Sequence, residues 1–430
     1  MKKNNRVLMD YQPGKDFALQ MDANDPLRAF REQFFIPKQN DDGECIYLCG
    51  NSLGLQPKNV RQFIEQELRD WQELGVEGHF RAKNPWMPYH EYLSEPTARL
   101  VGAKPGEVVV MNSLTVNLHL MMVSFYRPTP ARHKILIEYD AFPSDQYAVK
   151  SQIKFHGYHP ENSLIELKPR SGEEIVRIEE IRSLMEQEGQ SIALILVGAV
   201  NYYSGQLYDI KEITRLGHEY GCVVGFDLAH AVGNVLLNLH DWQVDFAVWC
   251  SYKYLNSGPG GIAGCFVHEK HARGEDIPRF AGWWGHNKEN RFLMHPEFEP
   301  IPGAEGWQLS NPPILPLAAL RASMEIFTEA GMNNLRRKSV LLTGYLEYLI
   351  QQLTSPQIRI ITPSDPDQRG CQLSIQTGKN GQWLYKQITS AGVVCDWREP
   401  DVIRVAPAPL YNTYEDVYNF VEILKKYLRK

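Results

Sequence analysis

Short apolar runs alternate with amphipathic segments through the middle of the chain. Three runs are almost entirely apolar, as the strands of a buried parallel sheet are: 134–138, 192–197 and 223–226. Apolar residues at helical spacing predict a helix over 173–188. A second helix is predicted over 209–220, with Asp209 as its N-cap and Gly221 at its end. This alternation is typical of an open, mostly parallel α/β sheet.

The pattern changes near Ser310 to Pro313. The elements predicted beyond it are a long helical stretch with a break at Gly331, two short strands and a terminal helix: 315–352, 358–361, 371–375 and 415–428. We therefore expect a large sheet domain over 50–312 and a smaller α+β domain formed by 1–49 and 313–430.

Composition and charge are those of a soluble globular protein. The 430 residues are 43% hydrophobic and 22% charged, and the formal net charge is -6. This acidic balance argues against nucleic-acid binding. The seven cysteines are scattered and lack zinc-type spacing with histidines, so we expect reduced thiols and no metal site.

The sequence predicts neither a secretory signal nor a membrane segment. The N-terminal segment Met1 to Asp10 has no long apolar region. The apolar run 192–200 is too short to cross a bilayer, and the stretch 108–126 is interrupted by polar residues. We therefore expect a cytoplasmic protein without membrane contact.

An aspartate and a lysine follow two neighbouring predicted strands. Asp227 ends the run 223–226, and Lys253 closely follows the predicted strand 247–250. Ligands of α/β sheets lie at the C-terminal ends of the strands, so both side chains are expected at one crevice. Enzymes that use pyridoxal 5'-phosphate (PLP) hold it as a lysine Schiff base, with a carboxylate at the pyridine nitrogen. The pair therefore predicts PLP, although Asp227 also suits a helix N-cap.

Five further side chains are candidates for the same crevice. Leu114 and Thr115 open a predicted helix after a strand, and helix N-termini bind phosphate. Phe142 follows the strand 134–138 and could stack on a pyridine ring, or lie in the core. His230, three residues after Asp227, is either a site residue or a structural histidine. Arg404 could bind a carboxylate through paired hydrogen bonds, or be exposed or ion-paired.

The chain resembles the kynureninase family, within the aminotransferase-class-V group of PLP enzymes. The resemblance extends from 50–54 to 405–412 and is clearest in four motifs: 112–119, 142–145, 225–234 and 249–256. It implies a PLP-dependent transferase-like fold (fold type I), with a large, mostly parallel-sheet domain and a smaller α+β domain. It also implies a homodimer whose active sites lie at the subunit interface.

The activity that this resemblance implies is hydrolytic cleavage between Cβ and Cγ of L-kynurenine or 3-hydroxy-L-kynurenine. The products are anthranilate or 3-hydroxyanthranilate and L-alanine, in tryptophan catabolism or the synthesis of nicotinamide precursors. Lys253 would hold PLP, Asp227 would face the pyridine nitrogen, and Tyr252 would assist proton transfer near the phosphate.

The resemblance also assigns the remaining site positions. The implied coenzyme-binding residues are Leu114, Thr115, Phe142, Pro143, Ser144, Asp145, Gly198, Asp227, His230, Tyr252, Lys253, Trp283 and Asn311. Of these, Trp283 and Asn311 would come from the partner subunit, and Gly198 replaces a serine that some members have. Arg404 would hold the substrate carboxylate. His79 and Asn311 would hydrogen-bond a ring hydroxyl, which favours 3-hydroxykynurenine, or would only organise water or the phosphate.

Two other functions fit the same candidate residues. A cysteine desulfurase or selenocysteine lyase also uses a lysine, an aspartate and a histidine, but needs a cysteine in a mobile loop. Cys371 and Cys395 lie in strand-like apolar segments instead. A non-catalytic regulator of the same fold is disfavoured because Lys253 and Asp227 are both present and no basic run exists.

Overall fold

The structure is a computed structural model, and it describes residues 9–39, 43–272 and 277–428. Most of the N-terminal segment in which no secretory signal was predicted, 1–8, therefore lies outside the described residues. Among the described helices, none has the length and hydrophobicity needed to cross a bilayer.

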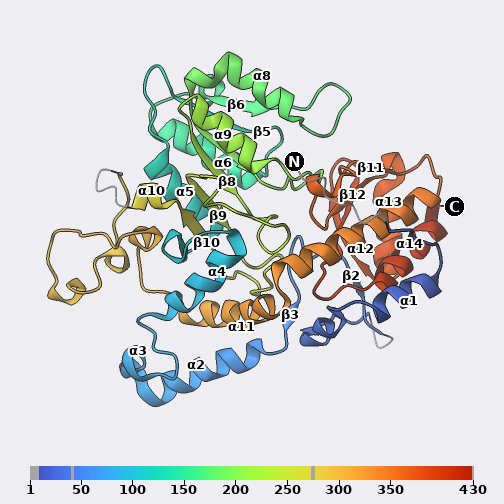
Figure 1. The fold of residues 1–430 in the computed structure, drawn as a ribbon, viewed down its shortest axis with the longest axis horizontal. Helices are drawn as coiled ribbons and strands as arrows, with labels where there is room; N and C mark the ends of the chain where they lie inside the picture. The colour runs from blue at the N-terminus through green and yellow to red at the C-terminus, as the bar shows by residue number, and fades with distance from the viewer. Residues whose placement is uncertain (1–8, 40–42, 273–276, 429–430) are drawn as a thin grey trace.

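A seven-stranded sheet forms the centre of the larger body, at the left of Figure 1. Its strands, in sheet order, are β4 Val108–Val110, β10 Gly264–Val267, β9 Phe246–Trp249, β8 Val223–Asp227, β7 Ile192–Gly198, β5 Lys134–Glu138 and β6 Leu164–Leu167. Within this sheet β10 is antiparallel to both of its neighbours, and β5 to β9 are parallel. The predicted strands and the mostly parallel α/β sheet are confirmed.

Helices pack around this sheet, so its strands are largely buried and apolar, except for the partly exposed edge strand β6. The helices of the larger body are α2 Val60–Leu74, α3 Gly78–Arg81, α4 Ser94–Val101, α5 Leu114–Phe125, α6 Pro143–Phe155, α7 Pro160–Ser163, α8 Ile178–Glu188, α9 Ile210–Glu219, α10 Glu269–Ala272 and α11 Ile314–Ala330. Asp209 caps α9 as predicted, because its side chain accepts the N–H of Glu212.

The helix predicted over 173–188 begins only at Ile178. The side chain of Gln206 binds both backbone groups of Val176. Its Oε1 accepts the N–H of Val176 at 2.9 Å, and its Nε2 donates to the carbonyl oxygen of Val176 at 2.6 Å. The side chain of Glu180 then accepts the N–H of Arg177, 2.9 Å away, which closes a capping box at the helix start. The backbone before Ile178 is therefore satisfied outside the helix.

A smaller antiparallel sheet lies at the right of Figure 1, with strands in the order β11 Arg359–Ile360, β12 Leu373–Gln376, β15 Val402–Val405 and β14 Asp396–Arg398. The helices of this body are α1 Lys15–Ala23, α12 Met332–Gln352, α13 Gly381–Ser390 and α14 Tyr414–Leu428. The strand predicted over 371–375 starts only at Leu373, because the N–H of Cys371 donates to the Asn234 side chain. Two short pairings complete the description: β1 Phe34–Phe35 with β3 Gln56–Pro57, and β2 Ile46–Tyr47 with β13 Val393–Val394.

The long helical stretch breaks at Gly331, as predicted. This residue has a φ of 73°, in the left-handed region where glycine is favoured. On its N-terminal side α11 packs against α2 of the larger body, and on its C-terminal side α12 packs against α14. The predicted domain limits, 50–312 for the large domain and 1–49 with 313–430 for the small one, stay a prediction.

Candidate active site

A cavity of about 340 Å³ lies at the C-terminal ends of β5, β7 and β8. Most of the predicted coenzyme residues line it: Leu114, Thr115, Phe142, Ser144, Asp145, Gly198, Asp227, His230, Tyr252 and Lys253. The predicted substrate residue Arg404 reaches the same cavity from β15 of the smaller sheet. Residues far apart in the sequence thus meet at the sheet edge where α/β proteins bind ligands.

Four predicted site residues do not line this cavity. Pro143 occupies the first turn of α6, between two residues that do. Trp283 and Asn311 are exposed, and His79 is partly exposed on α3, with Nδ1 3.0 Å from the carbonyl oxygen of Val76. Trp283 and Asn311 were predicted to come from the partner subunit, and the roles of all four residues stay predictions.

Lys253 and His230 are in direct contact. The Lys253 Nζ lies 3.0 Å from Nε2 of His230 and 5.9 Å from the centre of the Phe142 ring. Burial and the charge of Lys253 lower the pKa of His230 well below its usual value, so the imidazole is neutral and accepts a hydrogen bond from the ammonium. Its Nδ1 is buried and has no partner among the described residues, which leaves one polar atom available to a ligand.

Asp227 and Asp145 form a pair of buried carboxyl groups. Burial, the charge of Asp227 and that of Glu138 raise the pKa of Asp145 well above its usual value. Burial also raises the pKa of Asp227, but Lys253 and the N–H of Ala229, 2.7 Å away, act in the opposite direction. The proton of the pair therefore rests on Asp145, and Asp227 keeps the negative charge. Residues 228–235 form turns rather than a helix, so Asp227 caps a turn and not a helix.

The start of α5 offers a site for an anion. Ser113 precedes this 12-residue helix in an extended conformation, and its side chain does not cap it. The first N–H groups of the helix, at Leu114 and Thr115, are therefore available, and the helix dipole favours negative charge there. The Thr115 hydroxyl lies 2.9 Å from that of Ser144 in the first turn of α6. Two helix N-termini thus meet at the cavity, which suits a phosphate.

Two aromatic residues complete this part of the cavity. Phe142 lies at the start of α6 and is 44% exposed, so it is not a core residue. Its ring meets the Tyr202 ring edge to face, with centroids 5.4 Å apart. Burial and the neighbouring Cys250 thiol raise the pKa of Tyr252, which keeps its hydroxyl protonated and able to donate.

Arg404 is buried and held at both ends of its guanidinium. Nη1 donates to the carbonyl oxygen of Tyr202, 2.7 Å away, and Nη2 pairs with Asp396. Asp396 also accepts from Arg398, at 3.0 Å. The Nε of Arg404 has no partner among the described residues. The ion-paired alternative is therefore correct for Nη2, and Nε is the guanidinium nitrogen left for a ligand.

The sequence analysis missed several lining residues, including Glu138, Tyr202 and Arg398. Glu138 ends a buried strand, as Asp227 does, and that position could have identified it. Arg398 lies on the strand next to Arg404, so antiparallel pairing could have placed both at one edge. Tyr202 lies in a turn after β7, and no sequence pattern predicted its place.

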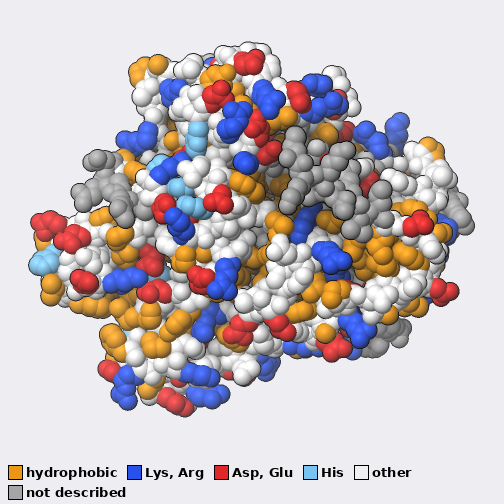
Figure 2. All heavy atoms as spheres, viewed as in Figure 1, with side chains coloured by type: hydrophobic (Ala, Val, Ile, Leu, Met, Phe, Trp, Pro, Cys, Tyr) orange, Lys and Arg blue, Asp and Glu red, His pale blue; other side chains and the backbone are white. Residues whose placement is uncertain are grey.

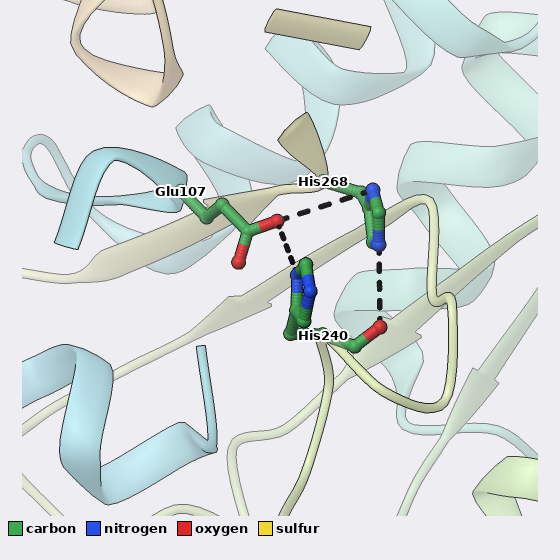
Figure 3. A group of neighbouring side chains, drawn as sticks. All are labelled: Glu107, His240 and His268. Atoms are coloured by element: carbon green, nitrogen blue, oxygen red, sulfur yellow. Dashed lines mark hydrogen bonds and ion pairs between the residues drawn. The ribbon is translucent and has the colours of Figure 1, made fainter. Parts of the chain in front are cut away.

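A second polar cluster, outside the cavity, is held together by hydrogen bonds (Figure 3). Glu107 lies 2.9 Å from Nδ1 of His240 and 3.9 Å from Nδ1 of His268. The Nε2 of His268 donates to the carbonyl oxygen of His240, and its Nδ1 accepts the N–H of Lys270. Both ring nitrogens of His268 are thus used, so the ring has no lone pair left for a metal ion. This cluster is structural.

Solved structures share this fold at low sequence identity. The cysteine desulfurase CsdA from Escherichia coli superposes with a TM-score of 0.76 at 17% identity, covering 94% of this chain and 98% of that one. The cystine C–S lyase C-DES gives a TM-score of 0.75 at 16% identity, over 89% and 97% of the two chains. The fold and the lysine–aspartate cavity together define a fold-type-I PLP enzyme.

Sequence comparison identifies the family within that class. The profile of the kynureninase C-terminal domain matches residues 335–424. Kynureninases from Koribacter versatilis (strain Ellin345) and Myxococcus xanthus (strain DK1622) are 63% and 57% identical, covering 95% and 98% of this chain and 96% and 99% of their own. The kynureninase of Mus musculus is 51% identical over 96% of this chain and 92% of its own. The chain belongs to the kynureninase family, whose members are PLP-dependent hydrolases of carbon–carbon bonds in ketonic substrates.

Proposed function

We propose that the chain hydrolyses kynurenine-type amino acids to an anthranilate and L-alanine. The observation that carries this proposal is the meeting of Lys253, Asp227 and Arg404 in one cavity of a kynureninase-family chain. The desulfurase alternative is not favoured, because the solved desulfurases are only 15–17% identical and share no more than the fold. In addition, Cys371 and Cys395 are both buried.

The residues present fit PLP. The N-termini of α5 and α6 suit its phosphate, the Phe142 ring suits the face of its pyridine ring, and Asp227 supplies an anion for the pyridine nitrogen. Lys253 is the amine within the cavity that can hold the aldehyde carbon. When bound, PLP supplies an electron sink for negative charge at the substrate Cα.

Lys253 is also the group placed to move protons. Its Nζ lies inside the cavity, and one flexible side chain can reach neighbouring carbons of the same bound substrate. The neutral His230 beside it orients the amine without adding positive charge, because its pKa is lowered. Tyr252, whose hydroxyl is protonated, lines the same cavity. The substrate carboxylate would bind Arg404 at Nε, which has no partner among the described residues.

We further propose that two chains associate and share their active sites. Figure 2 shows hydrophobic side chains exposed at the lower left, where α2 and α3 lie. In the segment from α2 to α3, Trp71, Val76 and Phe80 are 62%, 75% and 62% exposed. Such a group of large apolar side chains is typical of an interface. In this assembly we propose that Trp283, Asn311 and His79, all at least partly exposed in the single chain, reach the cavity of the partner chain.

The aromatic ring of the substrate would then meet polar groups from the second chain. His79 and Asn311 could hydrogen-bond a ring hydroxyl, and discrimination is largest when a site leaves polar groups unpaired without that hydroxyl. We therefore expect a higher kcat/KM for 3-hydroxy-L-kynurenine than for L-kynurenine. Initial rates with both substrates, with anthranilate-type fluorescence and alanine as readouts, test both activity and preference. A higher kcat/KM for L-kynurenine would contradict the preference, and absence of both products would contradict the activity.

The cysteines favour a cytoplasmic location for this reaction. All seven are free thiols in the structure. Exported proteins of oxidising compartments commonly pair their cysteines, whereas cytosolic proteins keep them reduced. A cytoplasmic enzyme acting in tryptophan catabolism or the synthesis of nicotinamide precursors is consistent with this.

A further inference from the structure

Glu138 is a buried carboxyl group with no assigned role. It is the last residue of β5, it is 4% exposed, and it lines the cavity. Its Oε2 accepts the N–H of Gly198, 2.9 Å away, at the end of the neighbouring strand β7. Gly198 in turn pairs in register with Asp227 on β8. Three adjacent strands therefore end in Glu138, Gly198 and Asp227, side by side at the floor of the cavity.

The Glu138 side chain fills the space that Gly198 leaves open. A Cβ atom placed on Gly198 would lie 2.7 Å from Oε1 of Glu138, closer than such contacts occur in proteins. A side chain at position 198 and this conformation of Glu138 therefore exclude each other. The carboxyl group of Glu138 thus stands where the side chain of residue 198 would otherwise meet the cavity.

The surroundings of Glu138 favour its uncharged form. Burial raises its pKa to about 7, the N–H of Gly198 acts against this rise, and the charge of Asp227 adds to it. The other titratable groups that face it are Asp145 and the phenols of Tyr202 and Tyr208. If Glu138 were ionised as well, the cluster would concentrate further negative charge in a buried site.

We propose that Glu138 is a positioning residue of the coenzyme site: its carboxyl group replaces the missing side chain of residue 198 and accepts the N–H of Gly198. It thereby fixes the end of β7 beside Asp227, whose negative charge faces the pyridine nitrogen. This inference rests on the binding of PLP at Lys253.

Two substitutions of similar volume separate hydrogen bonding from packing. Glu138→Gln keeps an acceptor for the Gly198 N–H, whereas Glu138→Met keeps only the volume. We expect the dissociation constant of PLP, measured by visible absorbance of the reconstituted protein, to rise about tenfold in Glu138→Met and to stay within about threefold of wild type in Glu138→Gln. The pH midpoint of the absorbance of the lysine-bound coenzyme should shift in Glu138→Met alone.

The contact with Gly198 gives an independent test. Gly198→Ala should weaken PLP binding about tenfold in the wild-type background, because the new Cβ displaces Glu138. In a Glu138→Ala background, Oε1 is absent, so Gly198→Ala should weaken PLP binding by less than about twofold. This comparison measures the coupling between the two positions, and the Glu138→Gln variant supplies a second measurement if the Glu138→Ala proteins do not fold.

Two results would overturn the inference. PLP affinity equal to wild type in both Glu138→Gln and Glu138→Met would show that only volume matters. A loss in Glu138→Gln as large as in Glu138→Met would show that an ionised carboxylate, rather than a hydrogen-bond acceptor, is required. If the losses of PLP affinity caused by Glu138→Ala and Gly198→Ala simply add in the double variant, the proposed contact between Glu138 and residue 198 is also contradicted. Lys253→Ala is the reference for the proposed function: if the wild type itself forms no lysine-dependent absorbance, the PLP site has failed rather than the role of Glu138.

Discussion

Burial and neighbouring charges together set the charges of three side chains in the cavity. Burial and the charge of Lys253 keep His230 neutral, and the burial of two adjacent aspartates puts the proton on Asp145 and the negative charge on Asp227. Lys253 and Asp227 were predictable because each follows an apolar strand run, and the family motifs around them are distinctive. Glu138 has the same kind of position but no distinctive motif, and Tyr202 and Arg398 reach the cavity only through the tertiary fold.

Arg404 gives the sharpest prediction at the scale of a single residue. Arg404→Lys removes the planar pair of donors that a carboxylate binds, so we expect KM for L-kynurenine to rise about 10- to 100-fold, with the coenzyme absorbance unchanged. Arg359→Lys, at an exposed arginine of the same small sheet, is the control and should leave KM unchanged. Steady-state kinetics of the two variants decide the point, and an unaltered KM in Arg404→Lys would contradict the carboxylate role.

At the scale of secondary structure, burial explains which strands could be predicted from the sequence. The inner strands β5, β7, β8 and β9 are largely buried, which is why they appear in the sequence as apolar runs and were predicted with nearly correct ends. The strands β6 and β10 were not predicted. Errors arose where a distant side chain satisfied the backbone. Gln206 pairs with Val176 and delays the start of α8, and Asn234 pairs with Cys371 and delays the start of β12. No local pattern predicts such contacts.

One carboxylate joins three elements of the larger body. Asp245, which precedes β9, accepts the N–H of Val224 on β8 and meets His218 of α9, together with His271 and Lys270 of α10. Burial alone would raise its pKa, but the hydrogen bonds from the two histidines and the charge of the lysine outweigh burial and hold the pKa well below its usual value.

Because this folded-state pKa is depressed, the stabilisation is present above the unfolded value of about 4 and is lost as the pH falls below it. We expect Asp245→Asn to lower the free energy of unfolding by about 3 kcal/mol at pH 7, and the difference from wild type to shrink below about pH 4. Asp241→Asn, at an exposed position of the same loop, should change the free energy of unfolding by less than about 0.5 kcal/mol. Urea unfolding of the three apoproteins across pH measures this, and equal stabilities of the two variants would refute the role of Asp245.

At the scale of the whole molecule, the cavity depends on how two bodies meet. The large sheet supplies Lys253 and Asp227, and the small sheet supplies Arg404. The break at Gly331 was predictable from a glycine in a helical pattern, but the packing of α11 on α2 was not, since it depends on surfaces far apart in the sequence. The second chain in the active site likewise rests on family resemblance and on the exposed apolar side chains of α2 and α3.

Shared active sites predict complementation between inactive variants. If Asn311 acts in the partner cavity, a mixed dimer of Lys253→Ala and Asn311→Ala chains holds one intact site, so co-expression should restore up to about one quarter of wild-type activity. The matched control combines Lys253→Ala with Asp227→Ala, both from the same cavity, and should restore none. A mixture no more active than its two parents would argue against sharing.

The most direct test of the account is the visible absorbance and turnover of Lys253→Ala beside the wild type, each supplied with PLP and L-kynurenine. The account predicts that the wild type shows the absorbance of lysine-bound PLP and releases fluorescent anthranilate together with alanine. Lys253→Ala should show neither the absorbance nor measurable turnover. Turnover near the wild-type level in Lys253→Ala, or a wild type that binds no PLP, would contradict the central claim that Lys253 and Asp227 form a PLP site.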